Sequence, residues 1–102
     1  MIQTLLHSGQ RSFSGRLTIY QDKAIAGLEQ SYAGAYLIPK RAGNAVKRNR
    51  LKRWLREDLR ELHKDGKVNG AIAIRFKGQA DEVTHNILKE NLRKIFNSGE
   101  SN

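Results

Sequence analysis

The segment from Lys40 to Arg60 combines basic side chains with leucines at helical spacing, and this pattern limits the folds open to the chain. It has nine Lys or Arg against two acids, whereas the other 81 residues have ten against eight. At 100° per residue the leucines share one helix face, and a mainly cationic set falls opposite. The leucines are Leu51, Leu55, Leu59 and Leu62, and the opposite set is Asn49, Lys52, Arg53, Arg56 and Arg60. We therefore expect a helix over about residues 44–64, held to a core by its leucines.

Length and composition predict one domain over residues 1–102. Cysteine is absent, which excludes disulfides and thiolate metal sites. The sequence has neither an apolar run of about 18 residues nor the basic start of a signal peptide. We expect a cytoplasmic protein with no membrane partner and no small-molecule substrate.

The remaining pattern predicts an α/β chain in the order αβββαβα, an α+β two-layer sandwich with a mixed sheet. The expected elements are a helix at 1–8, strands at 12–21, 24–28 and 32–38, the basic helix with Asn44 as N-cap, a strand at 70–77, and a helix from 81 or 82 to 97. In the first strand, alternation sets Phe13 in the core and Arg16 with Tyr20 on the opposite face.

The charge pattern favours a polyanionic partner. Arg48, Lys52 and Arg56 are spaced i, i+4, i+8 with no acid among them, and like charges at this spacing repel. A nucleic acid would relieve that repulsion, whereas a merely solvated face usually mixes signs. Arg48 falls near the leucine face. Either the first turn of the helix is irregular, or the long side chain of Arg48 reaches around an edge of that face. Asn49 fits either solvation or hydrogen bonding to RNA.

No catalytic constellation is visible in the sequence. His7, His63 and His85 lie in three different elements, and the acids of the basic helix stand beside arginines, which indicates pairing rather than a two-metal site. Trp54 and Tyr36 are more typical of packing residues than of stacking platforms. We expect binding rather than catalysis from this chain.

The run AGNAVKRNRLKRWLRE resembles the signature KKxGNAVxRNRxKRxxRE of the bacterial ribonuclease P protein component. The matching residues are Lys40, Arg41, Gly43, Asn44, Ala45, Val46, Arg48, Asn49, Arg50, Lys52, Arg53, Arg56 and Glu57. Family members have a basic amino-terminal segment that we expect to be absent here. Pro39 stands where Ser or Thr is usual, and Ile2 and Leu6 stand where Phe is common.

The resemblance implies that an RNA subunit with Mg²⁺ performs the hydrolysis, and that the protein binds no cofactor by itself. The basic helix would dock on the catalytic RNA through Lys40, Arg41, Asn44, Lys47, Arg48, Asn49, Arg50, Lys52, Arg53 and Arg56. A cleft between that helix and the sheet would take the 5′ leader of precursor tRNA, with Ile2, Leu6, Arg16, Tyr20 and Tyr36 in it. The family also implies a left-handed βαβ crossover around the basic helix.

Two rival functions stay open at this point. A structural or ribosomal RNA-binding protein would have the same charge but no effect on cleavage of precursor tRNA. A DNA-binding regulator would need a second helix at a tight turn before its recognition helix, whereas residues 32–38 have the pattern of a strand.

Overall fold

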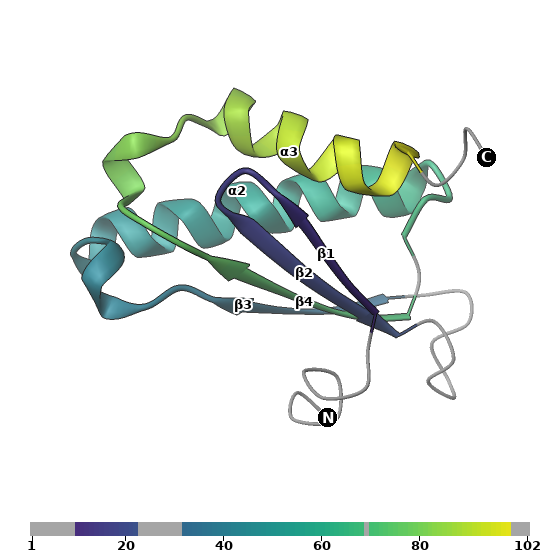
Figure 1. The fold of residues 1–102 in the computed structure, drawn as a ribbon, viewed down its shortest axis with the longest axis horizontal. Coiled ribbons are helices and arrows are strands. Elements are labelled where there is room, and N and C mark those ends of the chain that lie inside the picture. Colours follow the sequence, from purple (N-terminus) through teal and green to yellow (C-terminus); the bar gives the residue numbers. More distant parts are fainter. Residues whose placement is uncertain (1–9, 23–31, 69, 99–102) are drawn as a thin grey trace.

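Four strands form one mixed sheet, and both long helices pack on the same face of it (Figure 1). The structure, a computed structural model, describes residues 10–22, 32–68 and 70–98. The elements are β1 (Gln10–Ser14), β2 (Leu17–Asp22), β3 (Tyr32–Leu37), the 3₁₀ turn η1 (Lys40–Ala42), α2 (Ala45–Lys64), β4 (Gly70–Phe76), the 3₁₀ turn η2 (Ala80–Glu82) and α3 (His85–Ser98). The α+β two-layer class is confirmed. The helix expected at 1–8 and the strand expected at 24–28 lie outside the described residues.

The strand order is β1-β2-β4-β3, so β1 and β3 are the two edges of the sheet. β1 pairs with β2 and β2 with β4 in antiparallel fashion, whereas β3 and β4 are parallel. Parallel neighbours need a long crossover connection, and α2 is that connection. The left-handed course implied by the resemblance stays a prediction.

The single strand predicted at 12–21 is wrong, because these residues form a hairpin. Gly15 and Arg16 make a two-residue turn between β1 and β2, and Gly15 has a φ of 57°, which favours glycine. Phe13 pairs with Thr18 across the hairpin, so it shares a face with Thr18 and Tyr20 rather than with Ile19. Phe13 is 68% exposed, and its assignment to the core was therefore also wrong.

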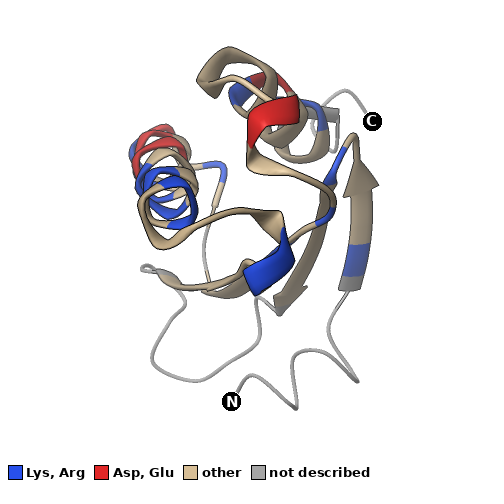
Figure 2. Ribbon diagram, turned by 90° about the vertical axis from the view of Figure 1, so that its left-hand side faces the viewer, with Lys and Arg blue, Asp and Glu red and all other residues tan. Residues whose placement is uncertain are grey.

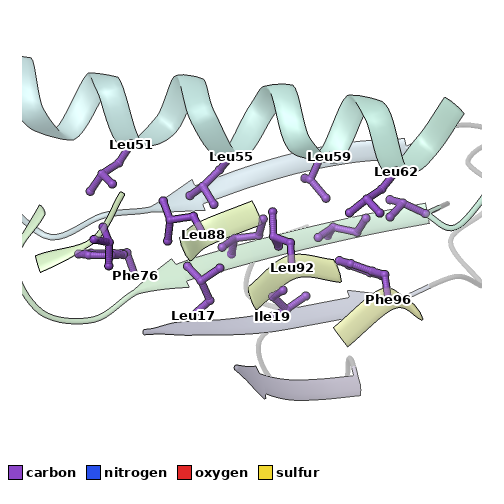
Figure 3. Close-up of a cluster of buried hydrophobic side chains, with 14 of the residues drawn as sticks. Leu17, Ile19, Leu51, Leu55, Leu59, Leu62, Phe76, Leu88, Leu92 and Phe96 are labelled. Atoms are coloured by element: carbon purple, nitrogen blue, oxygen red, sulfur yellow. The ribbon is translucent and has the colours of Figure 1, made fainter. Parts of the chain in front are cut away.

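The core lies between the sheet and the two helices, and the leucine face of α2 supplies much of it (Figure 3). Three leucines of α2, Leu51, Leu55 and Leu59, are completely buried. They share one cluster with residues of α3 and of the helix-facing sheet surface: Leu17, Ile19, Ile72, Ile74, Phe76, Leu88, Leu92 and Phe96. The predicted leucine face is confirmed. None of the helices in the described ranges has the length and apolar character of a membrane span.

Both predicted helix starts can be compared with the structure. Asn44 is the N-cap of α2, and its side-chain oxygen accepts a hydrogen bond from the backbone N–H of Lys47 at 2.9 Å, as predicted. The last helix begins later than predicted. Gln79 and Glu82 form a capping box at the start of η2, and Val83, which ends this turn, is extended with a φ of −132°. α3 therefore starts at His85.

The leucine face gives a direct test of this architecture. Leu59→Ala should lower the free energy of unfolding by about 2–5 kcal/mol, because it opens a cavity in the core. Val46→Ala, on the same helix but at a position 74% exposed, should change it by less than about 0.5 kcal/mol. Urea denaturation followed by circular dichroism measures both. Equal stability of the two variants would show that α2 does not rest on the sheet.

Candidate nucleic-acid interface

One side of α2 is a stripe of cations that faces away from the core. We define the cationic stripe as Asn49, Lys52, Arg53, Arg56 and Arg60. Four of these five side chains are exposed and Lys52 is half-buried. None of its four cations forms an ion pair with an acid in the described part of the chain, and Glu57 only borders the stripe. Figure 2 looks along α2 and shows its basic and acidic residues on different parts of the helix.

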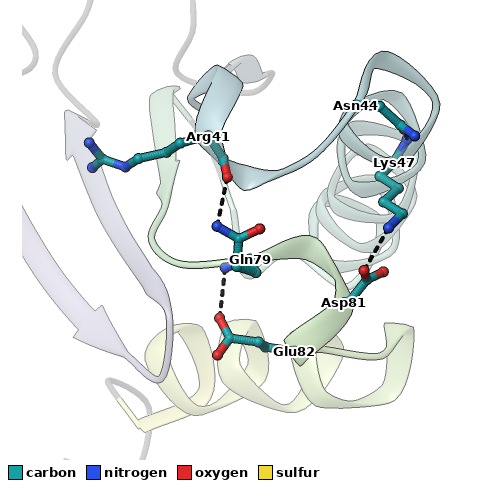
Figure 4. Close-up of polar contacts among 6 residues, drawn as sticks. All are labelled: Arg41, Asn44, Lys47, Gln79, Asp81 and Glu82. Carbon is teal, nitrogen blue, oxygen red and sulfur yellow. Dashed lines mark hydrogen bonds and ion pairs between the residues drawn. The ribbon is translucent and has the colours of Figure 1, made fainter.

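The side of α2 that faces η2 and α3 has mixed charge instead. Lys47 Nζ lies 2.6 Å from Asp81 Oδ2 (Figure 4). This hydrogen bond is the main reason that the pKa of Asp81 lies below its usual range. Further along, Lys89 Nζ lies 3.7 Å from Glu61 Oε2. Cations on this side are thus partly neutralised, whereas those of the stripe are not.

Arg50, in the middle of the motif, takes part in a stack between α2 and α3. Its guanidinium carbon lies 5.1 Å from the centroid of the Trp54 ring. The Trp54 ring is stacked on His85, with centroids 5.2 Å apart and ring planes at 4°. Trp54 is therefore a packing residue, and Arg50 contributes to the contact between α2 and α3 as well as to the basic surface.

Two further motif residues shape the start of α2. Arg48 Nε donates a hydrogen bond to the carbonyl of Gly43 at 3.1 Å, while the helix is regular from its first turn. Of the two alternatives for Arg48, the irregular first turn is therefore excluded, and the side chain runs back to the backbone before the helix. The Gln79 side chain donates to the carbonyl of Arg41 at 2.7 Å and joins η1 to the loop before α3 (Figure 4).

A groove of about 680 Å³ lies at the end of the sheet where β3 leads into η1. We call it the basic groove, and its lining residues are Thr18, Tyr36, Leu37, Ile38, Pro39, Arg41, Arg75, Phe76 and Lys77. Three of these are cations and none is an acid. Tyr36 and Arg41 were predicted from the sequence to lie on RNA-binding surfaces, whereas Arg75 and Lys77 were not. Their alternation with Ile74 and Phe76 was the signal that could have identified them.

The structure does not bring the predicted leader-cleft residues together. Tyr20 is only 6% exposed and pairs with Ala73, on the sheet face away from the helices. Tyr36 pairs with Ile74 on the helix-facing side, so the two tyrosines lie on opposite faces. The volume between α2 and the sheet, where the cleft was expected, is filled by the leucines.

Arg16 is also placed differently from the prediction. It belongs to the hairpin turn rather than to a strand face shared with Tyr20, and its Nη2 lies 3.2 Å from Glu82 Oε2. Ile2 and Leu6 lie outside the described residues.

The family model for ribonuclease P matches residues 1–99. The chain belongs to the ribonuclease P protein family. The ribonuclease P protein component of Bacillus cereus (strain 03BB102) is 32% identical over 96 residues, which cover 92% of this chain and 80% of that protein. The ribonuclease P protein component of an Exiguobacterium species is 32% identical over 95 residues, covering 92% and 79%.

Solved structures of ribonuclease P proteins share the fold. The protein from Staphylococcus aureus superposes with a TM-score of 0.75 at 22% identity, covering 96% of this chain and 87% of that one. The protein from Thermotoga maritima gives a TM-score of 0.77 at 20% identity, covering 93% and 87%. As a ribonuclease P protein component, the chain has a role in RNA processing within an endoribonuclease.

Two of the three histidines have structural partners in this ribonuclease P protein. His63 Nδ1 lies 2.8 Å from the carbonyl of Val68, near the end of α2. His85 Nε2 lies 3.0 Å from Asp58 Oδ1. Within the described ranges, no group of three His, Cys, Asp or Glu side chains could hold a metal ion. His7 lies outside those ranges.

Asp58 is a buried carboxylate at the contact of α2 with α3. Its side chain is 4% exposed, and its Oδ2 has no hydrogen-bond partner among the described residues. Burial raises the pKa of Asp58, and this effect outweighs the hydrogen bond and charge of His85 and the charge of Lys89, which lower the pKa.

This shift predicts how stability depends on pH. The folded-state pKa of Asp58 lies above its unfolded value near 3.8, so the folded state binds the extra proton between the two values. The contribution of Asp58 to the free energy of unfolding should therefore fall as pH rises from about 4 through the raised pKa. Thermal unfolding of the wild type and of Asp58→Asn across this pH range measures this contribution as the difference in stability between the two proteins.

Asp81 provides the control, because its pKa is lowered by Lys47. The stability difference between wild type and Asp81→Asn should have the opposite sign of pH dependence: the contribution of Asp81 is lost as pH falls below its unfolded value. If the contribution of Asp58 to the free energy of unfolding instead rose with pH, as that of Asp81 should, burial would not be the dominant influence on the pKa of Asp58.

Proposed function

We propose that this chain is the protein subunit of a ribonuclease P ribonucleoprotein, and that it binds the catalytic RNA through the cationic stripe and the 5′ leader of precursor tRNA through the basic groove. The observation that supports this most strongly is the stripe, whose cations have no acidic partner in the described part of the chain although α2 has acids elsewhere. Phosphates of a folded RNA would supply the missing counter-charge.

A rigid helix suits the surface of a folded RNA. The stripe extends from Asn49 to Arg60 on a helix whose opposite face is fixed by buried leucines. At a rise of 1.5 Å per residue, these positions span about 16 Å. Because the backbone is already ordered, binding immobilises only the ends of long side chains, which limits its entropic cost.

The basic groove suits an extended single strand. Arg41, Arg75 and Lys77 can contact phosphates along its rim, while the apolar residues of its lining can pack against sugars and bases. The groove lies beside η1, and η1 leads directly into α2. One protein could therefore contact the catalytic RNA and the substrate leader on adjacent surfaces.

In this proposal the RNA subunit, with Mg²⁺, hydrolyses the phosphodiester, and the protein contributes binding. Cations between two RNAs reduce the repulsion between their phosphates, as Mg²⁺ also does. The protein should therefore accelerate removal of the leader most strongly at low Mg²⁺. The rival function is that of a structural or ribosomal RNA-binding protein. Such a protein would not change the rate of precursor tRNA cleavage at any Mg²⁺ concentration.

The first experiment measures assembly with the catalytic RNA as a function of salt. If the four cations of the stripe neutralise phosphates, log K should fall against log salt with a slope of about −3 to −4. Arg53→Ala with Arg60→Ala should reduce the magnitude of the slope by about 1.5 and impair leader removal at low Mg²⁺. Arg93→Ala, an exposed site on α3, controls for loss of charge alone. An affinity insensitive to salt would contradict the proposal for the stripe.

The second experiment uses one assembled enzyme and two substrates, precursor tRNA and mature tRNA. Arg75→Ala should weaken binding of the precursor about tenfold through loss of a charged contact, and leave mature tRNA unchanged. Arg53→Ala, by contrast, should weaken assembly whatever the substrate. If Arg75→Ala weakened both substrates equally, the basic groove would not be the leader site.

A further inference from the structure

The free edge of β1 presents an aromatic ring to solvent. Phe13 is 68% exposed on an edge strand, and the Arg11 guanidinium carbon lies over its ring at 5.5 Å from the centroid. Arg11 and Phe13 alternate with Ser12, so both point to the sheet face away from the helices. The ring is thus held beside a cation at the edge opposite to β3.

A hollow of about 260 Å³ adjoins this ring, between β1 and α3. Its lining residues are Ser12, Phe13, Ser14, Lys94 and Ile95. Ser12 and Ser14 pair with Ile19 and Leu17 and therefore face the helices, whereas Phe13 borders the hollow only at the edge of the sheet. The lining has one cation and no acid. This arrangement suits a nucleotide at the sheet edge, whose base can stack on the face of the ring that Arg11 leaves open while its phosphate meets Lys94 in the hollow.

On the sheet face away from the helices, a row of side chains connects Phe13 with the basic groove. Phe13 pairs with Thr18, Thr18 with Arg75, and Arg75 with Leu37, so one residue of each strand lies in the row. Thr18, Leu37 and Arg75 also line the groove. Three strand spacings amount to about 14 Å. Since a stacked strand rises about 3.4 Å per nucleotide, at most about four nucleotides would bridge the two ends.

We propose that the β1 edge is a second site for single-stranded RNA, at which an unpaired nucleotide of the leader, upstream of those in the basic groove, stacks on Phe13. This inference rests on the proposed function of the groove. A second copy of the chain is a less suitable occupant, because each copy has a net charge of +9 and the hollow has no acid to offset it.

The experiment uses the assembled enzyme and precursors whose leaders are lengthened one nucleotide at a time. Phe13→Ala should leave short leaders unaffected and weaken binding about five- to a hundredfold once the leader reaches the β1 edge, which is the range for a lost base stack. Phe13→Tyr should retain the affinity because it keeps the ring. Ile87→Ala, at an apolar position 43% exposed on α3, should behave as wild type at every length.

Arg75→Ala separates this inference from the proposed function, because it should weaken short and long leaders alike. If Arg75→Ala acts in this way and Phe13→Ala has no effect at any length, the second site is refuted while the groove stands. A loss with Phe13→Ala on mature tRNA, or a change in oligomeric state measured by sedimentation, would also overturn it.

A direct binding measurement tests the β1 edge even if the basic groove is not the leader site. A single-stranded oligoribonucleotide is titrated onto the full chain, and onto Phe13→Ala and Lys94→Ala. Both variants should bind it more weakly than Ile87→Ala does, with circular dichroism confirming that all are folded. Equal affinity of all four proteins would refute a nucleotide site at the β1 edge.

Discussion

Burial of the leucine face of α2 is the interaction on which the rest of the structure depends. Like charges at i, i+4 destabilise a helix by about 0.2–0.5 kcal/mol per pair, and α2 contains several such pairs. Each fully buried leucine contributes about 1.5–3 kcal/mol, and three leucines of α2 are fully buried while Leu62 is 5% exposed. Burial therefore outweighs the repulsion, and it also fixes which way the cations point.

Neighbouring side chains then divide the cations of the motif into two groups. Asp81 holds Lys47, and the Trp54 and His85 stack holds Arg50, so these two cations help to join α2 to the later part of the chain. The cations of the stripe have no acidic partner in the described ranges, although the Arg56 guanidinium carbon lies 6.0 Å from the centroid of the Tyr36 ring. Residues of one motif, close together in sequence, thus differ in what they can offer an RNA.

The sequence was sufficient for features that depend on local periodicity. The leucine face, the Asn44 cap and the strand at 70–77 follow from spacing within one element. The hairpin did not follow from the sequence. Apolar and polar residues alternate straight through the two-residue turn at Gly15, yet the turn places Phe13 and Ile19 on opposite faces of the sheet. Contacts such as Arg16 with Glu82, or Gln79 with Arg41, join residues far apart in the chain, and no local pattern encodes them.

The uneven charge along α2 also bears on how an RNA would approach it. Cations dominate the amino-terminal half, whereas Asp58, Glu61 and Asp65 lie toward its carboxyl end and beside α3. A polyanion is attracted more strongly to the first region than to the second, where these acids lie beside Lys89 and Arg93. The long-range field therefore favours one orientation before any contact forms. In that orientation η1 and the basic groove, which adjoin the amino-terminal end of α2, lie next to the docked RNA. A substrate strand in the groove would then lie close to the catalytic RNA without any rearrangement of the protein.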